Sequence, residues 1–220
     1  MSLGVIGNTS VFGTEERRFE PCRDNKSYIM ELKIFDNFLP PEMEDKIEEQ
    51  IKYVPFRFAK NKQKEYHKIK VKDSNLTNWN RPGLLQCWTF ENDEWNMCDG
   101  IQWVEDVLKY LPFEYKLQRV KVNYNPQVNI SEDECMHPHC DINKGGYTAI
   151  YYVNDSDGDT VIFNEKTMDP VFNKEELSIK KRIKSKKGRL VMFDQDYLHA
   201  GMPPTKSDYR VVINFNFKIL

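Results

Sequence analysis

Two stretches in the first half of the chain place apolar residues at the spacing of an amphipathic helix. Within residues 31–54, a short apolar run leads into Pro41 and several acidic residues, and Ile47 and Ile51 lie four positions apart. Proline suits the first turn of a helix, acidic side chains favour its N-terminal end, and apolar residues four apart share one face. We therefore expect a strand followed by a helix. Residues 100–111 show similar apolar spacing and end at a proline, which predicts a second helix.

From residue 118 onward the apolar residues follow the period of short β-strands. Six runs rich in β-branched and aromatic residues are separated by turn signals: 118–124, 147–154, 159–163, 177–183, 188–194 and 209–217. Helices first and short strands afterwards predict a mainly β protein of the α+β class, with a β-sandwich or jelly-roll core and N-terminal helices packed outside. Neither a repeat nor a low-complexity linker interrupts the chain. We expect a single domain over residues 1–220, with an irregular arm at 1–27.

The last of these runs has two different faces. Strand alternation puts Val211, Ile213, Phe215 and Phe217 on one face, and Arg210, Val212, Asn214 and Asn216 on the other. The apolar face suits packing against a second layer or against the helices. The polar face either is half-exposed to solvent or lines the interior of a ligand-holding barrel, and alternation alone allows both.

The composition is that of a protein with a packed core. Of the 220 residues, 40% are hydrophobic and 13% are aromatic. The sequence has no apolar stretch of about 18 residues that would span a membrane, and its start lacks the basic and then apolar plan of a secretory signal. The five cysteines are scattered without a CxxC pair, which favours a reducing compartment over a disulfide framework. We expect a soluble, cytoplasmic protein without a membrane partner.

The net charge of −2 gives no general reason to expect nucleic acid as a partner. Two segments, 60–72 and 180–189, are nevertheless rich in lysine. One interpretation is a solvated loop and an exposed hairpin, which is the common fate of charge runs. The other is a pair of basic rims that steer an acidic substrate.

A histidine and an aspartate two positions apart are candidate metal ligands. In an extended segment, the side chains of His139 and Asp141 project to the same side, so both can reach one cation. His199, which follows the predicted strand 188–194, is the candidate third ligand. Two histidines and one carboxylate leave coordination positions open, as in non-heme Fe(II) oxygenases.

Other interpretations of this segment stay open. A His-x-Asp alone is more often a hydrogen-bonded loop histidine than a ligand. His137 has the same spacing from His139, and Cys135 and Cys140 could join the two histidines in a zinc cluster. Structural zinc sites, however, use two separated pairs of ligands, and no second pair follows downstream. We expect His137 to shape the loop and the cysteines to be incidental thiols.

The order of these features along the chain carries more information than any one of them. His-x-Asp is followed by the runs "TAIYYVN", "DGDTVIF" and "GRLVMFD", then by His199, and then by an arginine eleven residues later in "YRVVINFNF". This order closely resembles the 2-oxoglutarate- and Fe(II)-dependent dioxygenases, in particular the prolyl 4-hydroxylase branch of the double-stranded β-helix superfamily. The resemblance covers about residues 118–217 and implies a double-stranded β-helix, or jelly-roll, core.

The resemblance also implies roles for individual residues. It places iron on three ligands: His139, Asp141 and His199. Arg210 falls on the family's basic residue, which holds the far carboxylate of 2-oxoglutarate, and a planar guanidinium suits that task. Tyr152 matches a tyrosine whose hydroxyl reaches the same carboxylate. Tyr124 matches a further family tyrosine on the strand before His-x-Asp.

The activity implied is oxidative decarboxylation of 2-oxoglutarate with O2, with ascorbate in a supporting role, coupled to hydroxylation of a C–H bond. By resemblance to the prolyl 4-hydroxylase branch, we expect the substrate to be a peptidyl (prolyl) or free amino acid. Two alternatives remain. The same chemistry could act on another small metabolite or on a nucleic acid base, or the chain could be a non-catalytic, metal-binding β-barrel module.

Overall fold

The computed structural model describes residues 32–60, 68–79, 83–91, 94–95, 103–111, 113–141, 145–166 and 176–220. The arm expected at 1–27 lies outside the described residues. The helices are α1 (Pro41–Gln50), the short 3-10 helix η1 (Ile51–Tyr53) and α2 (Trp103–Leu108). The strands are β1 (Lys33–Phe35), β2 (Arg57–Lys60), β3 (Lys70–Val71), β4 (Thr77–Asn78), β5 (Gly83–Glu91), β6 (Glu94–Trp95), β7 (Tyr115–Pro126), β8 (Glu134–Cys135), β9 (Tyr147–Tyr152), β10 (Ser156–Lys166), β11 (Glu176–Leu177), β12 (Ile179–Ser185), β13 (Leu190–Asp194), β14 (Tyr197–Gly201) and β15 (Tyr209–Ile219).

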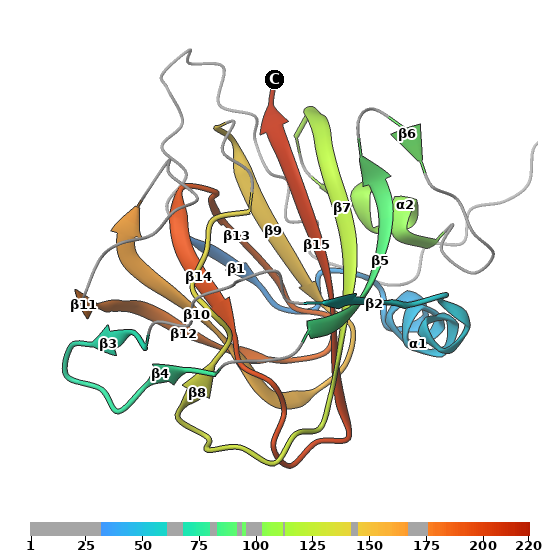
Figure 1. The fold of residues 1–220 in the computed structure, drawn as a ribbon. Helices are drawn as coiled ribbons and strands as arrows, with labels where there is room; N and C mark the ends of the chain where they lie inside the picture. The colour runs from blue at the N-terminus through green and yellow to red at the C-terminus, as the bar shows by residue number, and fades with distance from the viewer. Residues whose placement is uncertain are drawn as a thin grey trace, which may run out of the picture.

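Two antiparallel sheets form the core of the fold. The large sheet has the strand order β1-β13-β9-β15-β7-β5-β2, with β6 paired to β5, and the small sheet has the order β12-β10-β14. Figure 1 shows the two sheets as two walls, with strands from distant parts of the sequence side by side. The expected strands all occur, and the mainly β jelly-roll architecture predicted for the core is confirmed.

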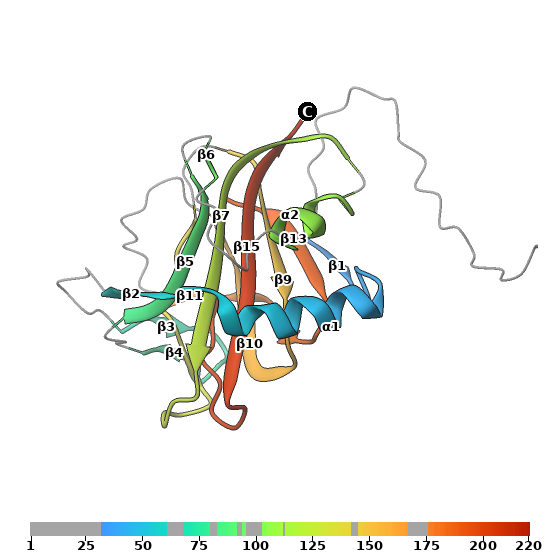
Figure 2. The same cartoon turned by 90° about the vertical axis from the view of Figure 1, so that its right-hand side faces the viewer.

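The outer face of the large sheet packs against the helices. Val211, Ile213 and Phe215 of β15 lie in one buried cluster with Ile47 of α1 and Val104 of α2. Figure 2 shows α1 running across this side of the sheet. Burial of such apolar side chains is the main favourable contribution to folding. The prediction that N-terminal helices pack outside the β core is therefore confirmed for α1 and α2.

The inner face of the large sheet is polar and buried. Arg210 and Asn214 of β15 are 3% and 6% exposed, so their face lines the interior rather than solvent. On β7, the residues directly opposite Arg210, Val212, Asn214 and Asn216 are Asn125, Asn123, Lys121 and Arg119. Directly opposed residues in an antiparallel pair point to the same face. A stripe of polar side chains on β7 therefore lies beside the polar face of β15.

The lysine-rich segment 180–189 is largely an outer strand and a turn. β12 is the outer strand of the three-stranded sheet as described, and charged side chains protect such edges from pairing with other chains. Arg182 is ion-paired to Asp159 at 2.7 Å, and Arg189 is ion-paired to Asp36 at 2.6 Å. These contacts favour the interpretation of an exposed structural hairpin. Of the segment 60–72, residues 61–67 lie outside the described part of the chain.

No helix among the described residues is both long and apolar enough to cross a lipid bilayer.

Candidate active site

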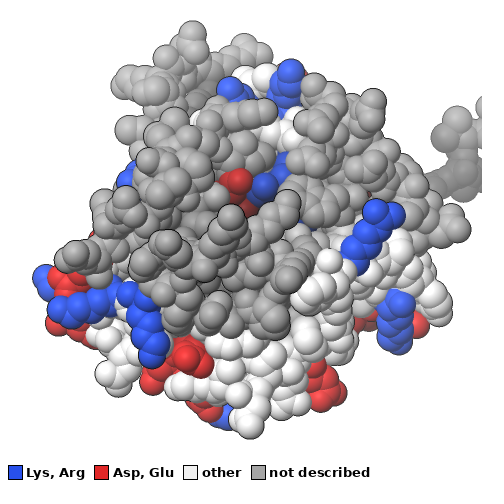
Figure 3. All heavy atoms as spheres, viewed as in Figure 1, with Lys and Arg blue, Asp and Glu red and all other residues white. Residues whose placement is uncertain are grey.

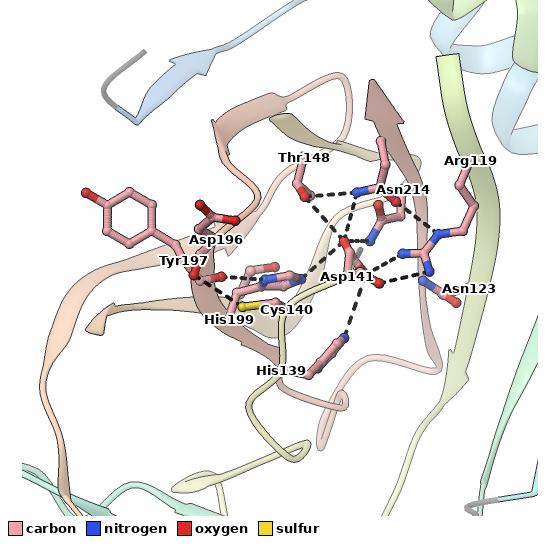
Figure 4. Close-up of polar contacts among 12 residues, drawn as sticks. Arg119, Asn123, His139, Cys140, Asp141, Thr148, Asp196, Tyr197, His199 and Asn214 are labelled. Carbon is pink, nitrogen blue, oxygen red and sulfur yellow. Dashed lines mark hydrogen bonds and ion pairs between the residues drawn. The ribbon is translucent and has the colours of Figure 1, made fainter. Parts of the chain in front are cut away.

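The three predicted metal ligands meet between the two sheets. The backbone amides of His139 and His199 each donate to the carbonyl oxygen of the other at 3.0 Å, which holds the His-x-Asp segment beside β14. The ligand atoms of His139, Asp141 and His199 all lie within 4.8 Å of one another. His199 Nε2 is 3.5 Å from Asp141 Oδ2, and His139 Nε2 is 3.8 Å from Asp141 Oδ1. Figure 4 shows the three side chains converging on one point, a geometry that can hold one metal ion.

Backbone carbonyl groups orient both imidazole rings. His139 Nδ1 lies 3.0 Å from the carbonyl oxygen of His137, and His199 Nδ1 lies 3.2 Å from that of Tyr197. A carbonyl oxygen only accepts, so Nδ1 of each ring carries the proton and donates it. The lone pair of each neutral imidazole is then on Nε2, the nitrogen that faces Asp141. Such hydrogen bonds behind a histidine are typical of metal ligands.

Four polar side chains hold the carboxylate of Asp141. Oδ2 accepts hydrogen bonds from Asn214 Nδ2 at 2.9 Å and from Asn216 Nδ2 at 3.2 Å, with Thr148 Oγ1 at 3.4 Å. Oδ1 is ion-paired to Arg119 Nη2 at 2.7 Å, and the side chain of Asp141 is 1% exposed. Figure 4 shows Arg119, Thr148 and Asn214 reaching Asp141. The carboxylate is fixed before any metal binds.

None of these four residues was among the predicted site residues. All four lie on the inner face of the large sheet, on β7, β9 and β15. The signal that could have found them was the alternation of polar residues in two segments that pair only in the folded chain.

The ionisation of the ligands suits metal binding. Burial raises the pKa of Asp141, but His199, Arg119 and Lys121 outweigh it and hold the pKa well below its usual range. Desolvation lowers the pKa of His139, although 44% of its side chain is exposed, which limits this contribution. At neutral pH the site therefore offers a carboxylate and a neutral imidazole at these two positions.

His137 and the cysteines stand apart from this group. His137 Nδ1 lies 3.0 Å from Asn78 Nδ2, and Asn78 in turn accepts a hydrogen bond from the backbone amide of Ile69. His137 thus ties the loop to the β4 region, as expected. Burial raises the pKa of Cys135 to about 12, so it is a thiol at neutral pH. In the described part of the chain, the candidate metal group contains no cysteine.

Arg210 lies in the same cavity as the three candidate ligands. The cavity is lined by Gln86, Lys121, Asn123, Asn125, Met136, His139, Ile150, Thr160, His199, Gly201, Arg210, Val212 and Asn214. Arg210 Nη2 donates to Thr160 Oγ1 at 2.8 Å, and the Tyr152 hydroxyl donates to the same oxygen at 2.7 Å. Arg210 Nε is buried without a hydrogen-bond partner. Burial lowers the pKa of Arg210, but a guanidinium stays charged.

A glycine leaves the space that this guanidinium needs. A Cβ at Gly158 would lie 2.7 Å from Arg210 Cδ and 2.6 Å from the carbonyl oxygen of Met202. Contacts that short do not occur, so a larger residue would displace the arginine or the backbone. The guanidinium of Arg210 is therefore positioned by close packing of β10 and the segment before β15.

The two predicted tyrosines have different outcomes. Tyr152 lies beside Arg210, but its hydroxyl is bound to Thr160, and Thr160 rather than Tyr152 lines the cavity. The structure does not bring Tyr124 to the site, which corrects the prediction. Its ring stacks on Tyr209 at 5.7 Å between centroids and also contacts Phe56, on the outer face of the sheet. Strand alternation turns the neighbours of Tyr124 inward instead.

Figure 3 shows the charged side chains of the described residues on the face seen in Figure 1. Acidic and basic atoms lie side by side near the centre of this face, and further charged side chains lie toward its edges.

Comparison with known proteins places these observations in a family. The model of the 2OG-Fe(II) oxygenase superfamily matches residues 126–218. A search of curated proteins finds no match.

Among solved structures, a prolyl hydroxylase from Trichoplax adhaerens, in complex with a hypoxia inducible factor peptide fragment, is similar with a TM-score of 0.51 and 14% identity, over 85% of this chain and 83% of that one. A 2OG-Fe(II) oxygenase family oxidoreductase from Burkholderia pseudomallei is similar with a TM-score of 0.52 and 8% identity, over 85% and 84% of the two chains. AviO1 from Streptomyces viridochromogenes Tue57 is similar with a TM-score of 0.52 and 10% identity, over 86% and 89%.

At these identities the solved structures show a shared fold, and the family model covers the segment that carries the three candidate ligands and Arg210. Two imidazoles and one carboxylate are the donor set of non-heme Fe(II) oxygenases, and a buried guanidinium with an unpartnered nitrogen suits a carboxylate. The residues present therefore fit the cofactors of the family. Residues 126–218 thus match the model of the 2OG-Fe(II) oxygenase superfamily, the chain shares the fold of a solved prolyl hydroxylase, and its site residues fit Fe(II) and 2-oxoglutarate.

Proposed function

We propose that this oxygenase is a hydroxylase in which His139, Asp141 and His199 hold Fe(II) and Arg210 holds the far carboxylate of 2-oxoglutarate. The observation that carries this assignment is the buried, unpartnered Nε of Arg210 in the cavity that the two histidines also line. A buried charge is costly unless an opposite charge accompanies it. A dicarboxylate that binds metal at one end supplies that charge at the other.

When bound, Fe(II) and 2-oxoglutarate supply, with O2, the oxidation of an unactivated C–H bond. The protein's own residues supply geometry and exclude water. Asn214, Asn216 and Arg119 fix the carboxylate of Asp141, and Thr160 fixes the guanidinium of Arg210. Arg210 and His199 are themselves almost fully buried, and burial strengthens the electrostatic contacts that they make.

For the substrate, we propose a peptidyl or free amino acid, with the prolyl side chain favoured. The support is a fold shared with a prolyl hydroxylase whose structure contains a peptide fragment. The sequence order from His139 to Arg210 also resembles that branch. A peptide or a small molecule is accordingly the partner that we propose, rather than nucleic acid.

Turnover of 2-oxoglutarate provides the first test. The purified protein, given Fe(II), ascorbate, 2-oxoglutarate and O2, should release succinate, and a His199→Ala variant should not. Mass spectrometry of peptide and amino acid pools treated with the enzyme should then reveal products heavier by about 16 Da. A product of that mass found only in a nucleobase or other metabolite pool would redirect the substrate. Absence of succinate from the wild type would indicate a non-catalytic metal-binding β-barrel.

A further inference from the structure

We propose that Lys121 forms a second carboxylate-binding site, at the metal end of the cavity, while Arg210 serves the other end. The carboxylate could come from the metal-bound end of 2-oxoglutarate or from the primary substrate. Both sources present the same chemistry to the ammonium group. This inference deepens the proposed function and rests on it.

The position of Lys121 follows from the pairing of β7 with β15. Lys121 lies directly opposite Asn214, whose amide donates to Asp141, whereas Arg210 lies opposite Asn125. Lys121 and Asn125 are four residues apart on one strand, which is roughly 13 Å along its axis. The small sheet shows the same two levels. On β10, Ile162 lies opposite the candidate ligand His199, whereas Thr160, which binds Arg210, lies opposite Gly201. Lys121 thus belongs to the metal level of the cavity, and Arg210 belongs to the far level.

Lys121 is buried at this level. The residue is 8% exposed and lines the cavity together with His139 and His199. Most lysines lie at the surface, and a buried cation in a cleft is a common mark of a functional site.

The charge of the cavity favours an anion at this level. Among the described residues that line it, Lys121 and Arg210 are cations and none is acidic. With the cofactors bound, Fe(II), Arg119, Lys121 and Arg210 carry five positive charges, and Asp141 and 2-oxoglutarate carry three negative ones. Counted over these described residues, the site would remain positive with 2-oxoglutarate in place. A ligand with a carboxylate is therefore favoured over a neutral or cationic one.

Neighbouring amides suggest what could accompany this carboxylate. Asn214 Oδ1 is buried without a hydrogen-bond partner and lines the same cavity. Gln86 Nε2 donates to Asn123 Oδ1 at 3.0 Å and closes the wall on the β5 side of Lys121. An N–H group beside a carboxylate, as in a free amino acid, could donate to Asn214 Oδ1. L-Proline is thus a suitable probe, and L-prolinamide is its neutral counterpart.

The test uses three variants of the full chain. Lys121→Met removes the charge and keeps the length of the side chain, and Lys121→Arg keeps the charge. Lys116→Met is the matched control, because Lys116 is an exposed lysine near the start of the same strand, opposite Lys218 and away from Asn214. Thermal unfolding shows whether each variant is folded. 2-Oxoglutarate is then titrated into the anaerobic Fe(II) protein and followed through its metal-to-ligand charge-transfer absorption.

Two results support the proposal and identify the source. If the carboxylate is that of 2-oxoglutarate, Lys121→Met weakens its binding about 10- to 100-fold, as expected for loss of a charge-assisted hydrogen bond, and Lys121→Arg keeps part of the affinity. If the carboxylate is that of the substrate, 2-oxoglutarate affinity is unchanged. L-Proline or acetate then perturbs the absorption of the wild type but not of Lys121→Met, and L-prolinamide perturbs neither.

One result overturns the proposal: Lys121→Met binds 2-oxoglutarate like the wild type, and no carboxylate probe distinguishes the two proteins. This failure differs from failure of the proposed function. In that case the wild type itself would show no 2-oxoglutarate-dependent absorption band, so its affinity could not differ from that of the variants.

Discussion

Replacement of Arg210 tests how the cavity binds its co-substrate. Arg210 is 3% exposed, so solvent does little to screen its charge. Breaking one side of a buried ion pair costs on the order of 3–5 kcal/mol, which corresponds to roughly a hundred- to several-thousandfold loss of affinity. Arg210→Ala should therefore lower 2-oxoglutarate affinity by about that factor. Arg210→Lys keeps the charge but loses the planar fork, and should lie between Arg210→Ala and the wild type.

Two further properties separate this role from a structural one. The affinity for Fe(II) should barely change, because Arg210 does not contact the three candidate ligands in the described structure. The protein without co-substrate should be no less stable in Arg210→Met, since a buried guanidinium with an unpartnered Nε is costly to keep. The shift of Tm that 2-oxoglutarate produces in the wild type should, in contrast, be lost.

The assay is anaerobic titration of 2-oxoglutarate into the Fe(II) protein, followed through the charge-transfer absorption. Lys218→Ala serves as a matched control, because Lys218 is an exposed residue of the same strand. Unchanged 2-oxoglutarate affinity in Arg210→Ala would refute the assignment and leave Arg210 as a buried strand residue with another purpose.

Three other predictions concern the supports of the site. Asn214→Leu removes an amide that donates to the carboxylate ligand and should lower Fe(II) affinity about 10- to 100-fold, measured by anaerobic titration; unchanged affinity would contradict this. Gly158→Ala should weaken 2-oxoglutarate binding but spare Fe(II), because its Cβ would lie 2.7 Å from Arg210 Cδ; equal loss of both ligands in the same titrations would argue for general misfolding instead. Asp157 accepts four hydrogen bonds from residues 205–207, which outweigh desolvation and lower its pKa. Its folded pKa lies below the unfolded value, so its stabilisation is present above about pH 4 and is lost as the pH falls further; Asp157→Asn should flatten the acid limb of unfolding free energy against pH, and an unaltered limb would count against this cap.

Local sequence patterns predicted the features that are set by residues close together in the chain, such as the two faces of a strand. The alternation in 210–217 separated an apolar face from a polar one, and the fold places them outside and inside the barrel. The spacing of His139 and Asp141 correctly indicated that both reach one point, and His199 on β14 supplies the third side chain. Period and spacing are local properties, so a single sequence contains them.

Features that depend on strand register were harder to predict. Tyr124 was expected at the site, but it shares the outward face of β7 with Val120 and Val122. The polar residues between them, Arg119 and Lys121 among others, point inward. Their contacts with β15 join positions about 90 residues apart, and no local pattern specifies that pairing. A one-residue change of parity moves every side chain of a strand to the opposite face, which is why an aromatic residue alone was misleading.

The contact between His137 and Asn78 could likewise not be predicted from local sequence patterns. Its partner Asn78 lies 59 residues earlier in the chain, on the short strand β4, which pairs with β8. Sequence spacing gave His137 and His139 equal standing as ligands. Only the fold separates them, because it turns one ring toward Asn78 and the other toward Asp141.

The central claim is that His139, Asp141 and His199 bind Fe(II) in the cavity where 2-oxoglutarate also binds. The most direct test is anaerobic Fe(II) titration followed by 2-oxoglutarate, in the wild type and in the variants His137→Ala, His139→Ala and His199→Ala. The account predicts that the wild type and His137→Ala bind Fe(II) and develop the charge-transfer band, whereas His139→Ala and His199→Ala do not. Loss of metal in His137→Ala as complete as in His139→Ala, or a wild type that binds Fe(II) without ever developing the band, would contradict it.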